Sequence, residues 1–277
     1  MVGCLMKTAV VVDKSYLQGA SRSHMHELAG SYRLLMSEAL LYELLSKPKD
    51  YKACFSKLPS VDNPVDIVLH VGGYLSKEID SRRPAPRPSD RPRQFRFQFN
   101  PRLLDDDYEL PEEAANEIER QRNELLADVQ TLKERALCAP DYFPDVFAGS
   151  DLQRWRARAE AESLIAQPES LLDVYAQLRA PKGIKRFPPR KLLSKDWALY
   201  RWLQIEFLLA LDLYSRFGST LGKVLSATTE ERIEHDVLDA QYMFIGVLEG
   251  ALATQDKKLQ RWFTLLRPDG LLLRYDG

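Results

Sequence analysis

Two carboxylates near opposite ends of the chain are of the type that binds metal ions. Asp13 follows the apolar run Thr8 to Val12, and Asp256 follows a second apolar run, Ala251 to Thr254. Carboxylates that share one cleft cannot all ionise unless a divalent cation neutralises them, and hard oxygen ligands suit Mg²⁺ or Mn²⁺. These residues therefore predict a site for a divalent cation.

Further acids lie on segments that we expect to be helical. Asp236 and Asp239 are three residues apart, which places both on one face of a helix, and Glu43 lies on an earlier helical segment. In open α/β sheets the binding crevice lies outside the carboxyl ends of the strands, so Asp13 and Asp256 should be neighbours. We expect four or five acids to converge there.

The elements that must position these acids follow from the apolar pattern. Short β-branched runs predict strands, and apolar residues at helical spacing predict helices. The order strand, helix, strand at the start of the chain indicates a right-handed parallel crossover. The expected strands are 8–12, 65–71 (ended by Gly72 and Gly73), 251–254 and 271–274, and the expected helices are 24–46 (one or two), 111–137, 152–179 (a pair broken near Pro168), 197–217, 228–250 and 258–266.

Composition limits the class of protein. Three widely spaced cysteines without a Cys-x-x-Cys pair argue against a disulfide framework and a zinc site, and they favour a reducing cytoplasm. No segment approaches the roughly 18 uninterrupted apolar residues of a membrane span. The net charge of −1 gives no reason to expect nucleic acid, so local charge is the better guide.

Two basic segments stand out against that neutral average. Residues 82–102 and 182–201 each hold seven Lys or Arg against one Asp. Such segments supply phosphate contacts, and three phenylalanines in the first could stack on unpaired bases, although a linker without any ligand is an equal alternative for it. We expect a nucleic acid, single-stranded or structured RNA, as the substrate. The residues chosen for substrate contact are Arg93, Arg96, Lys185 and Arg186.

Three blocks of the chain resemble the PIN-domain nuclease family. The first is Val10-Val-Val-Asp-Lys-Ser15, with an Asp at the end of strand one and a hydroxyl residue after it. The second is Leu35-Met-Ser-Glu-Ala-Leu-Leu-Tyr-Glu43, with a helix-borne Glu. The third combines Asp236-x-x-Asp239-Ala-Gln-Tyr with Gly250-Ala-Leu-Ala-Thr-Gln-Asp256, a late acidic helix followed by a Thr-x-Asp turn.

The resemblance implies a fold and a division of the chain. The implied fold is α/β, a PIN-like three-layer α/β/α arrangement with a central parallel sheet plus a mostly helical insertion. Residues 1–75 would form the N-terminal part of the PIN-like domain, 76–195 the insertion and 196–277 the C-terminal part.

The resemblance also implies metal-dependent hydrolysis of phosphodiester bonds. Asp13, Glu43, Asp239 and Asp256 would hold the metal, with Asp236 as an additional or replacement ligand. Asp256 or Asp239 would act on the attacking water, and Ser15 and Thr254 would hydrogen-bond the ligands or phosphate.

Two departures from the family pattern keep alternatives open. Lys14 stands where the family usually has a small or uncharged residue, and almost 200 residues separate Glu43 from Asp239. A catalytically inactive PIN-like protein that binds nucleic acid or acts as a scaffold is therefore the rival hypothesis. A toxin or defence nuclease restrained by an inhibitory partner is a third, and a homo-oligomer is compatible with the sequence. Each acid taken alone could also be an ordinary turn or solvated helix residue.

Overall fold

The computed structural model describes residues 7–61, 63–90, 101–105, 107–177 and 188–275, which form a mixed α/β structure with two compact units. Unit 1 comprises residues 1–71, 86–122 and 241–277, and unit 2 comprises residues 72–85 and 123–240. Described segments from both the first and the last part of the chain, 7–71 and 241–275, thus belong to unit 1. Residues 196–240, which we expected in the PIN-like part, belong to unit 2, and residues 86–122 of the expected insertion belong to unit 1.

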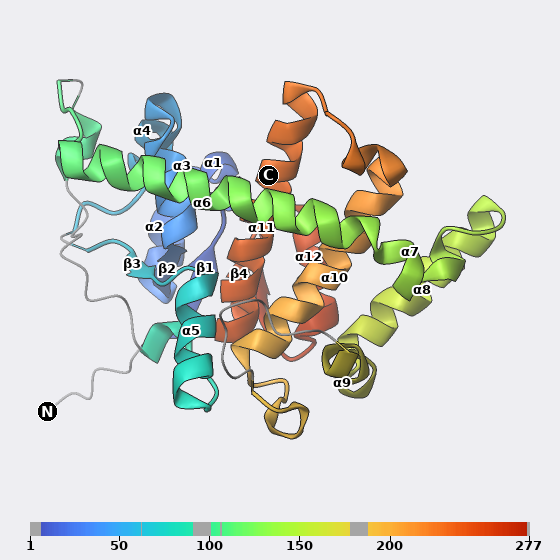
Figure 1. Cartoon of the computed structure of the whole chain (residues 1–277). Coiled ribbons are helices and arrows are strands. Elements are labelled where there is room, and N and C mark those ends of the chain that lie inside the picture. Colours follow the sequence, from blue (N-terminus) through green and yellow to red (C-terminus); the bar gives the residue numbers. More distant parts are fainter. Residues whose placement is uncertain (1–6, 62, 91–100, 106, 178–187, 276–277) are drawn as a thin grey trace, which may run out of the picture. The chain divides into compact units, whose positions relative to one another are not determined.

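Unit 1 contains a five-stranded, all-parallel sheet with the order β3-β2-β1-β4-β5 (Figure 1). The four residues of β1 are at most 6% exposed, because this central strand is covered on both faces. At the edge of the sheet, β5 is only partly buried. The strands are β1 (Ala9–Val12), β2 (Arg33–Ser37), β3 (Asp66–Val68), β4 (Ala251–Ala253) and β5 (Leu271–Leu273).

Four helices of unit 1, which are α1, α2, α3 and α12, begin at side-chain caps, whereas α4 begins at Pro48 without one. Ser21 accepts a hydrogen bond from the His24 amide, and Ser37 accepts one from the Leu40 amide, which satisfies amides that lack a partner within the helix. The helical elements are α1 (Lys14–Gly19), α2 (Arg22–Ser31), α3 (Glu38–Leu45), α4 (Pro48–Phe55), α12 (Lys257–Leu266) and the short 3₁₀ turns η1 (Pro88–Asp90) and η2 (Pro101–Leu104).

Unit 2 is helical in the part of the chain that the structure describes. Two long helices, α6 (Glu112–Leu137) and α11 (Ala227–Glu249), start in one unit and end in the other. The remaining elements are α5 (Val71–Ser81), α7 (Ala139–Tyr142), η3 (Pro144–Val146), α8 (Asp151–Ala166), α9 (Pro168–Gln177), η4 (Arg190–Leu192), α10 (Ala198–Phe217) and η5 (Gly218–Gly222).

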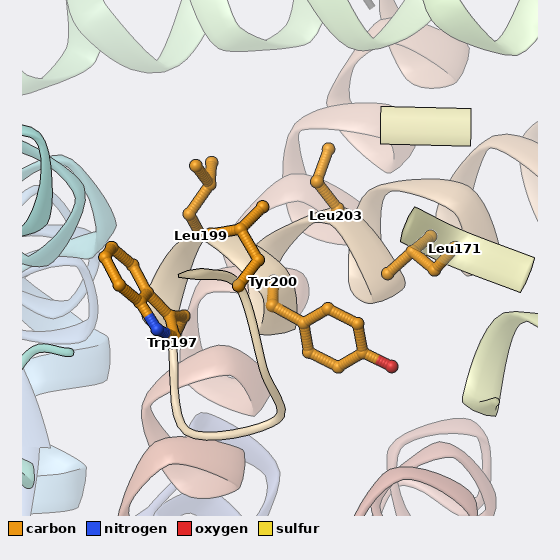
Figure 2. Close-up of a cluster of buried hydrophobic side chains, with 6 residues drawn as sticks. Leu171, Trp197, Leu199, Tyr200 and Leu203 are labelled. Atoms are coloured by element: carbon orange, nitrogen blue, oxygen red, sulfur yellow. The ribbon is translucent and has the colours of Figure 1, made fainter. Parts of the chain in front are cut away.

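A buried cluster joins α9 to the start of α10 (Figure 2). Its buried members are Leu171, Leu193, Trp197, Leu199, Tyr200 and Leu203. The buried Glu78 carboxylate of α5 accepts hydrogen bonds from the amides of Ala198 and Leu199 at 2.6 and 2.8 Å. Glu78 therefore satisfies the first amides of α10, where negative charge is stabilising.

Most predicted elements are confirmed, but two predictions were wrong. Residues 33–37 form the strand β2, although we expected helix throughout 24–46. A short apolar run between two helices fits the period of a strand as well as that of a helix. The pairing of β2 with β1 and β3 makes this run a strand. Gly72 and Gly73 do not end a strand segment but lie in the first turn of α5.

No helix within the described ranges has both the length and the apolar character that a membrane crossing requires.

Candidate functional site

The order in which the chain adds strands to the sheet of unit 1 reverses between β1 and β4. From β1 the chain proceeds to β2 and β3 on one side, whereas β4 and β5 lie on the other. Val12 pairs with Ala253, and the Asp13 amide donates to the Ala253 carbonyl at 3.2 Å. Ligand crevices of open α/β sheets lie at such a switch point. The two strand ends bring Asp13 and Thr254 together.

Asp13 is 1% exposed and is surrounded by hydrogen-bond donors. The Tyr16 amide donates to Oδ1 at 2.7 Å, so that Asp13 caps α1. The Thr254 hydroxyl donates to Oδ2 at 2.5 Å, and the Ser15 hydroxyl lies 2.9 Å from both oxygens. Three neutral groups thus fix the orientation of this carboxylate.

Ser15 and Thr254 also join the Asp13 turn to the turn that carries Asp256. Ser15 Oγ accepts from the amides of Gln255 at 2.9 Å and of Asp256 at 3.2 Å, and Thr254 Oγ1 accepts from the Asp256 amide at 3.1 Å. Asp256 in turn caps α12, because its Oδ1 accepts from the Leu259 amide at 2.9 Å. We refer to Asp13, Ser15, Thr254 and Asp256 as the switch-point cluster.

Burial raises the pKa of Asp13 from 3.8 to about 6. The hydrogen bonds from Thr254, Tyr16 and Ser15 act in the opposite direction, and the nearby charge of Asp256 raises the pKa further. A carboxyl group that titrates near neutral pH can accept and donate protons, and such groups are frequent at active sites.

Glu43 lies in a second, separately neutralised group. Lys14 Nζ is 2.7 Å from Glu43 Oε1 and 3.6 Å from Asp50 Oδ2, and the Tyr242 hydroxyl donates to Glu43 Oε2. The side chain of Glu43 is 5% exposed. This predicted ligand therefore carries an ammonium counter-ion supplied by the chain itself.

Asp236 and Asp239 lie on the part of α11 that belongs to unit 2. Asp236 is buried and forms an ion pair with Arg216, whose guanidinium also contacts Asp212 at 3.0 Å. A guanidinium thus neutralises Asp236 within its own unit. The convergence of these two acids with those of unit 1 stays a prediction.

The candidate ligands suit Mg²⁺ or Mn²⁺ in kind but not in number. Carboxylate and hydroxyl oxygens meet at the switch point, as hard cations require. Among the residues with described positions, however, no group of three or more His, Cys, Asp or Glu side chains could hold a metal ion. The four- or five-carboxylate site that we expected therefore stays a prediction.

The four basic residues chosen for substrate contact, Arg93, Arg96, Lys185 and Arg186, lie outside the described residues. The phenylalanines of the first basic segment do so as well.

Sequence reasoning missed an aromatic group beside Asp13. The Tyr275 ring contacts Tyr16 edge-on at 5.1 Å and stacks on His24 at 5.6 Å between ring centroids. The backbone of Tyr275 is held by the side-chain amide of Gln255 at 3.1 Å. Burial, followed by the charge of Asp13, raises the pKa of the Tyr275 hydroxyl. The sequence did offer a signal for this neighbour. Tyr275 directly follows the expected strand 271–274, and residues that follow parallel strands lie at the same edge of the sheet as Asp13.

Unit 2 has a pocket of about 270 Å³ of its own. Its lining includes the ion pair between Arg135 and Glu206 together with the aromatic rings of Tyr142 and Phe207. None of the predicted site residues lines it.

Comparison with protein-family models, with curated proteins and with solved structures found no match to this chain. The likeness to PIN domains therefore rests on the residues quoted above.

Proposed function

We propose that the sheet of unit 1 belongs to a PIN-like, three-layer α/β/α domain that hydrolyses phosphodiester bonds. The proposed substrate is RNA, and the proposed cofactor is Mg²⁺ or Mn²⁺. The observation that supports this proposal most strongly is the switch-point cluster, in which Asp13 and Asp256 are tied together by Ser15 and Thr254 although about 240 residues separate them.

The chain's own side chains have distinct roles in this proposal. Asp13, with a pKa of about 6, takes in this proposal the role that the resemblance gave to Asp256 or Asp239: it accepts a proton from the attacking water or returns one to the leaving oxygen. Ser15 and Thr254 hold its carboxylate in one orientation. Asp256 adds a second negative charge beside it, and that charge favours binding of a cation at the same edge.

Cleavage of a fluorescently labelled single-stranded RNA by the full chain tests the proposal. The assay is run with Mg²⁺, with Mn²⁺ and with EDTA. We expect cleavage with at least one of the metals and a loss of about 100-fold or more in Asp13→Asn and in Asp256→Asn, the range seen when a positioned acid or base is removed. Asparagine still caps a helix, so both variants should keep their fold by circular dichroism.

A matched control is Asp151→Asn on α8, which changes an exposed carboxylate. Its cleavage rate should equal that of the wild type. Full activity in Asp13→Asn, or equal losses in all three variants, would contradict a reacting centre at the switch point.

The second candidate is a PIN-like protein that binds nucleic acid without cleaving it. The ion pair between Lys14 and Glu43 favours it, because a partly buried ammonium already neutralises one of the predicted metal ligands. Filter binding would then show RNA affinity that falls with salt, and no cleavage would occur in Mg²⁺ or Mn²⁺.

A further inference from the structure

Lys14 bridges two carboxylates that come from different helices. It is the first residue of α1, and its Nζ lies 2.7 Å from Glu43 on α3 and 3.6 Å from Asp50 on α4. The lysine side chain is 15% exposed, and that of Glu43 is 5% exposed. In this setting solvent screens the attraction less than at an open surface.

The two oxygens of Glu43 have different partners. Oε1 faces the ammonium of Lys14, and Oε2 accepts a hydrogen bond from the buried Tyr242 hydroxyl. Tyr242 belongs to the part of α11 that lies in unit 1, so α1, α3 and α11 all contribute to this arrangement. The phenol and the ammonium together fix the rotamer of Glu43.

An ammonium and a divalent cation compete for such an oxygen. Both need the lone pairs of Oε1, and two cations within bonding distance of one oxygen repel each other strongly where water is scarce. Lysine is a compact point charge, so it can stand where a metal ion would stand between two carboxylates.

We infer that Lys14 is the resident cation of the Glu43 and Asp50 pair and that it excludes a divalent cation from Glu43. Lys14 thus balances the charge of Glu43 without metal, and any cation used by the protein binds without Glu43. The inference concerns which acids of the proposed site can bind a divalent cation. It rests on the proposed function only in treating Glu43 as a predicted ligand.

Binding of Mn²⁺ to the full chain, measured without RNA from the electron paramagnetic resonance signal of free Mn²⁺, tests this inference. Lys14→Met keeps the length of the side chain and removes its charge. We expect this variant to bind Mn²⁺ at least ten-fold more tightly than the wild type, or to gain one site. Lys14→Arg, which keeps the charge, should behave like the wild type.

The double variant Lys14→Met with Glu43→Gln shows whether Glu43 is the group that binds the additional Mn²⁺. If the cation takes the place of Lys14 at Glu43, the gain disappears in the double variant. Unchanged Mn²⁺ affinity in Lys14→Met, or a gain that persists in the double variant, overturns the inference.

Lys14→Met could fail to fold without metal, because it leaves Glu43 without its counter-ion. Circular dichroism with and without Mn²⁺ then decides the matter. Folding that Mn²⁺ restores supports the inference, and a chain that stays unfolded in Mn²⁺ while the double variant folds overturns it.

The outcome is independent of catalysis. Absence of RNA cleavage by the wild type together with the Mn²⁺ gain in Lys14→Met refutes the nuclease proposal alone. Cleavage that depends on Asp13 together with no Mn²⁺ gain refutes the inference alone.

Discussion

Asp13 and Glu43 are both buried carboxylates of unit 1, yet their neighbours stabilise them in different ways. Asp13 receives hydrogen bonds from an amide and two hydroxyls, none of which carries a formal charge. Glu43 receives a full positive charge from Lys14. Neutral donors offset burial only in part, which is why the pKa of Asp13 is raised to about 6. Removing charge at the two places should therefore change stability in opposite directions.

The largest effect is expected at Lys14. Lys14→Met leaves Glu43 buried without its counter-ion and should lower the free energy of unfolding by about 3 kcal/mol, the scale for breaking a buried ion pair. Urea denaturation at pH 7 in EDTA measures it. Adding Glu43→Gln should recover most of the loss, because the charge that needed a partner is gone. A variant as stable as the wild type would show that the ion pair contributes nothing.

Asp13→Asn should change the free energy of unfolding in the opposite direction. Because the folded-state pKa is raised above the unfolded value of 3.8, the folded wild type loses stability as pH rises from about 4 to about 6. The shift corresponds to at most about 3 kcal/mol, and the amide recovers part of it, so we expect a gain of about 1–2 kcal/mol above pH 6. Denaturation at pH 7.5 and at pH 4 should show the gain only at the higher pH. A loss of stability at pH 7.5 would break the contrast with Lys14.

Thr254→Val removes a hydroxyl that donates to the ionised Asp13. We expect a loss of about 1 kcal/mol at pH 7.5, and a smaller loss near pH 4, where Asp13 is protonated. Thr264→Val on α12 is the matched control, since its exposed hydroxyl donates to the helix carbonyl of Gln260. Equal losses in both variants would show that the hydroxyl near Asp13 has no special role.

The smallest effect is expected at Asp50. This carboxylate is 3.6 Å from Lys14 and about a third exposed, so Asp50→Asn should change the free energy of unfolding by less than about 0.5 kcal/mol. The same urea titration measures the change. A loss as large as that of Lys14→Met would mean that Asp50, and not Glu43, is the main partner of the lysine.

Local pattern was sufficient for most of the elements. The β-branched run before Asp13 predicted β1, and the long apolar period ending at Gly218 predicted α10, whose C-terminal glycine has the positive φ of 54° that favours this residue. The strand β2 was missed because Leu34 to Met36 is too short to distinguish a buried strand from a helix. Its identity depends on pairing with strands on both sides, which no local window contains.

The candidate site likewise has a part that the sequence predicted and a part that it did not. Apolar runs that end in Asp13 and in Asp256 predicted two neighbouring carboxylates, and the parallel pairing of β1 with β4 brings these turns together. The partner of Glu43 was not predictable, although the sequence showed Lys14 as a departure from the family pattern. A lysine can reach several positions, and only the packing of α1 against α4 and the placement of α3 decide which acids it meets.

By itself, the sequence determined which segments are strands and helices at most positions, and which acids follow buried strands, because apolar period and chain-breaking residues act over a few neighbours. The tertiary structure alone decided which groups stabilise each acid: uncharged hydroxyls at Asp13, an ammonium at Glu43 and a guanidinium at Asp236. Electrostatic partners are set by distances of a few ångströms between residues far apart in the chain, and the fold fixes those distances.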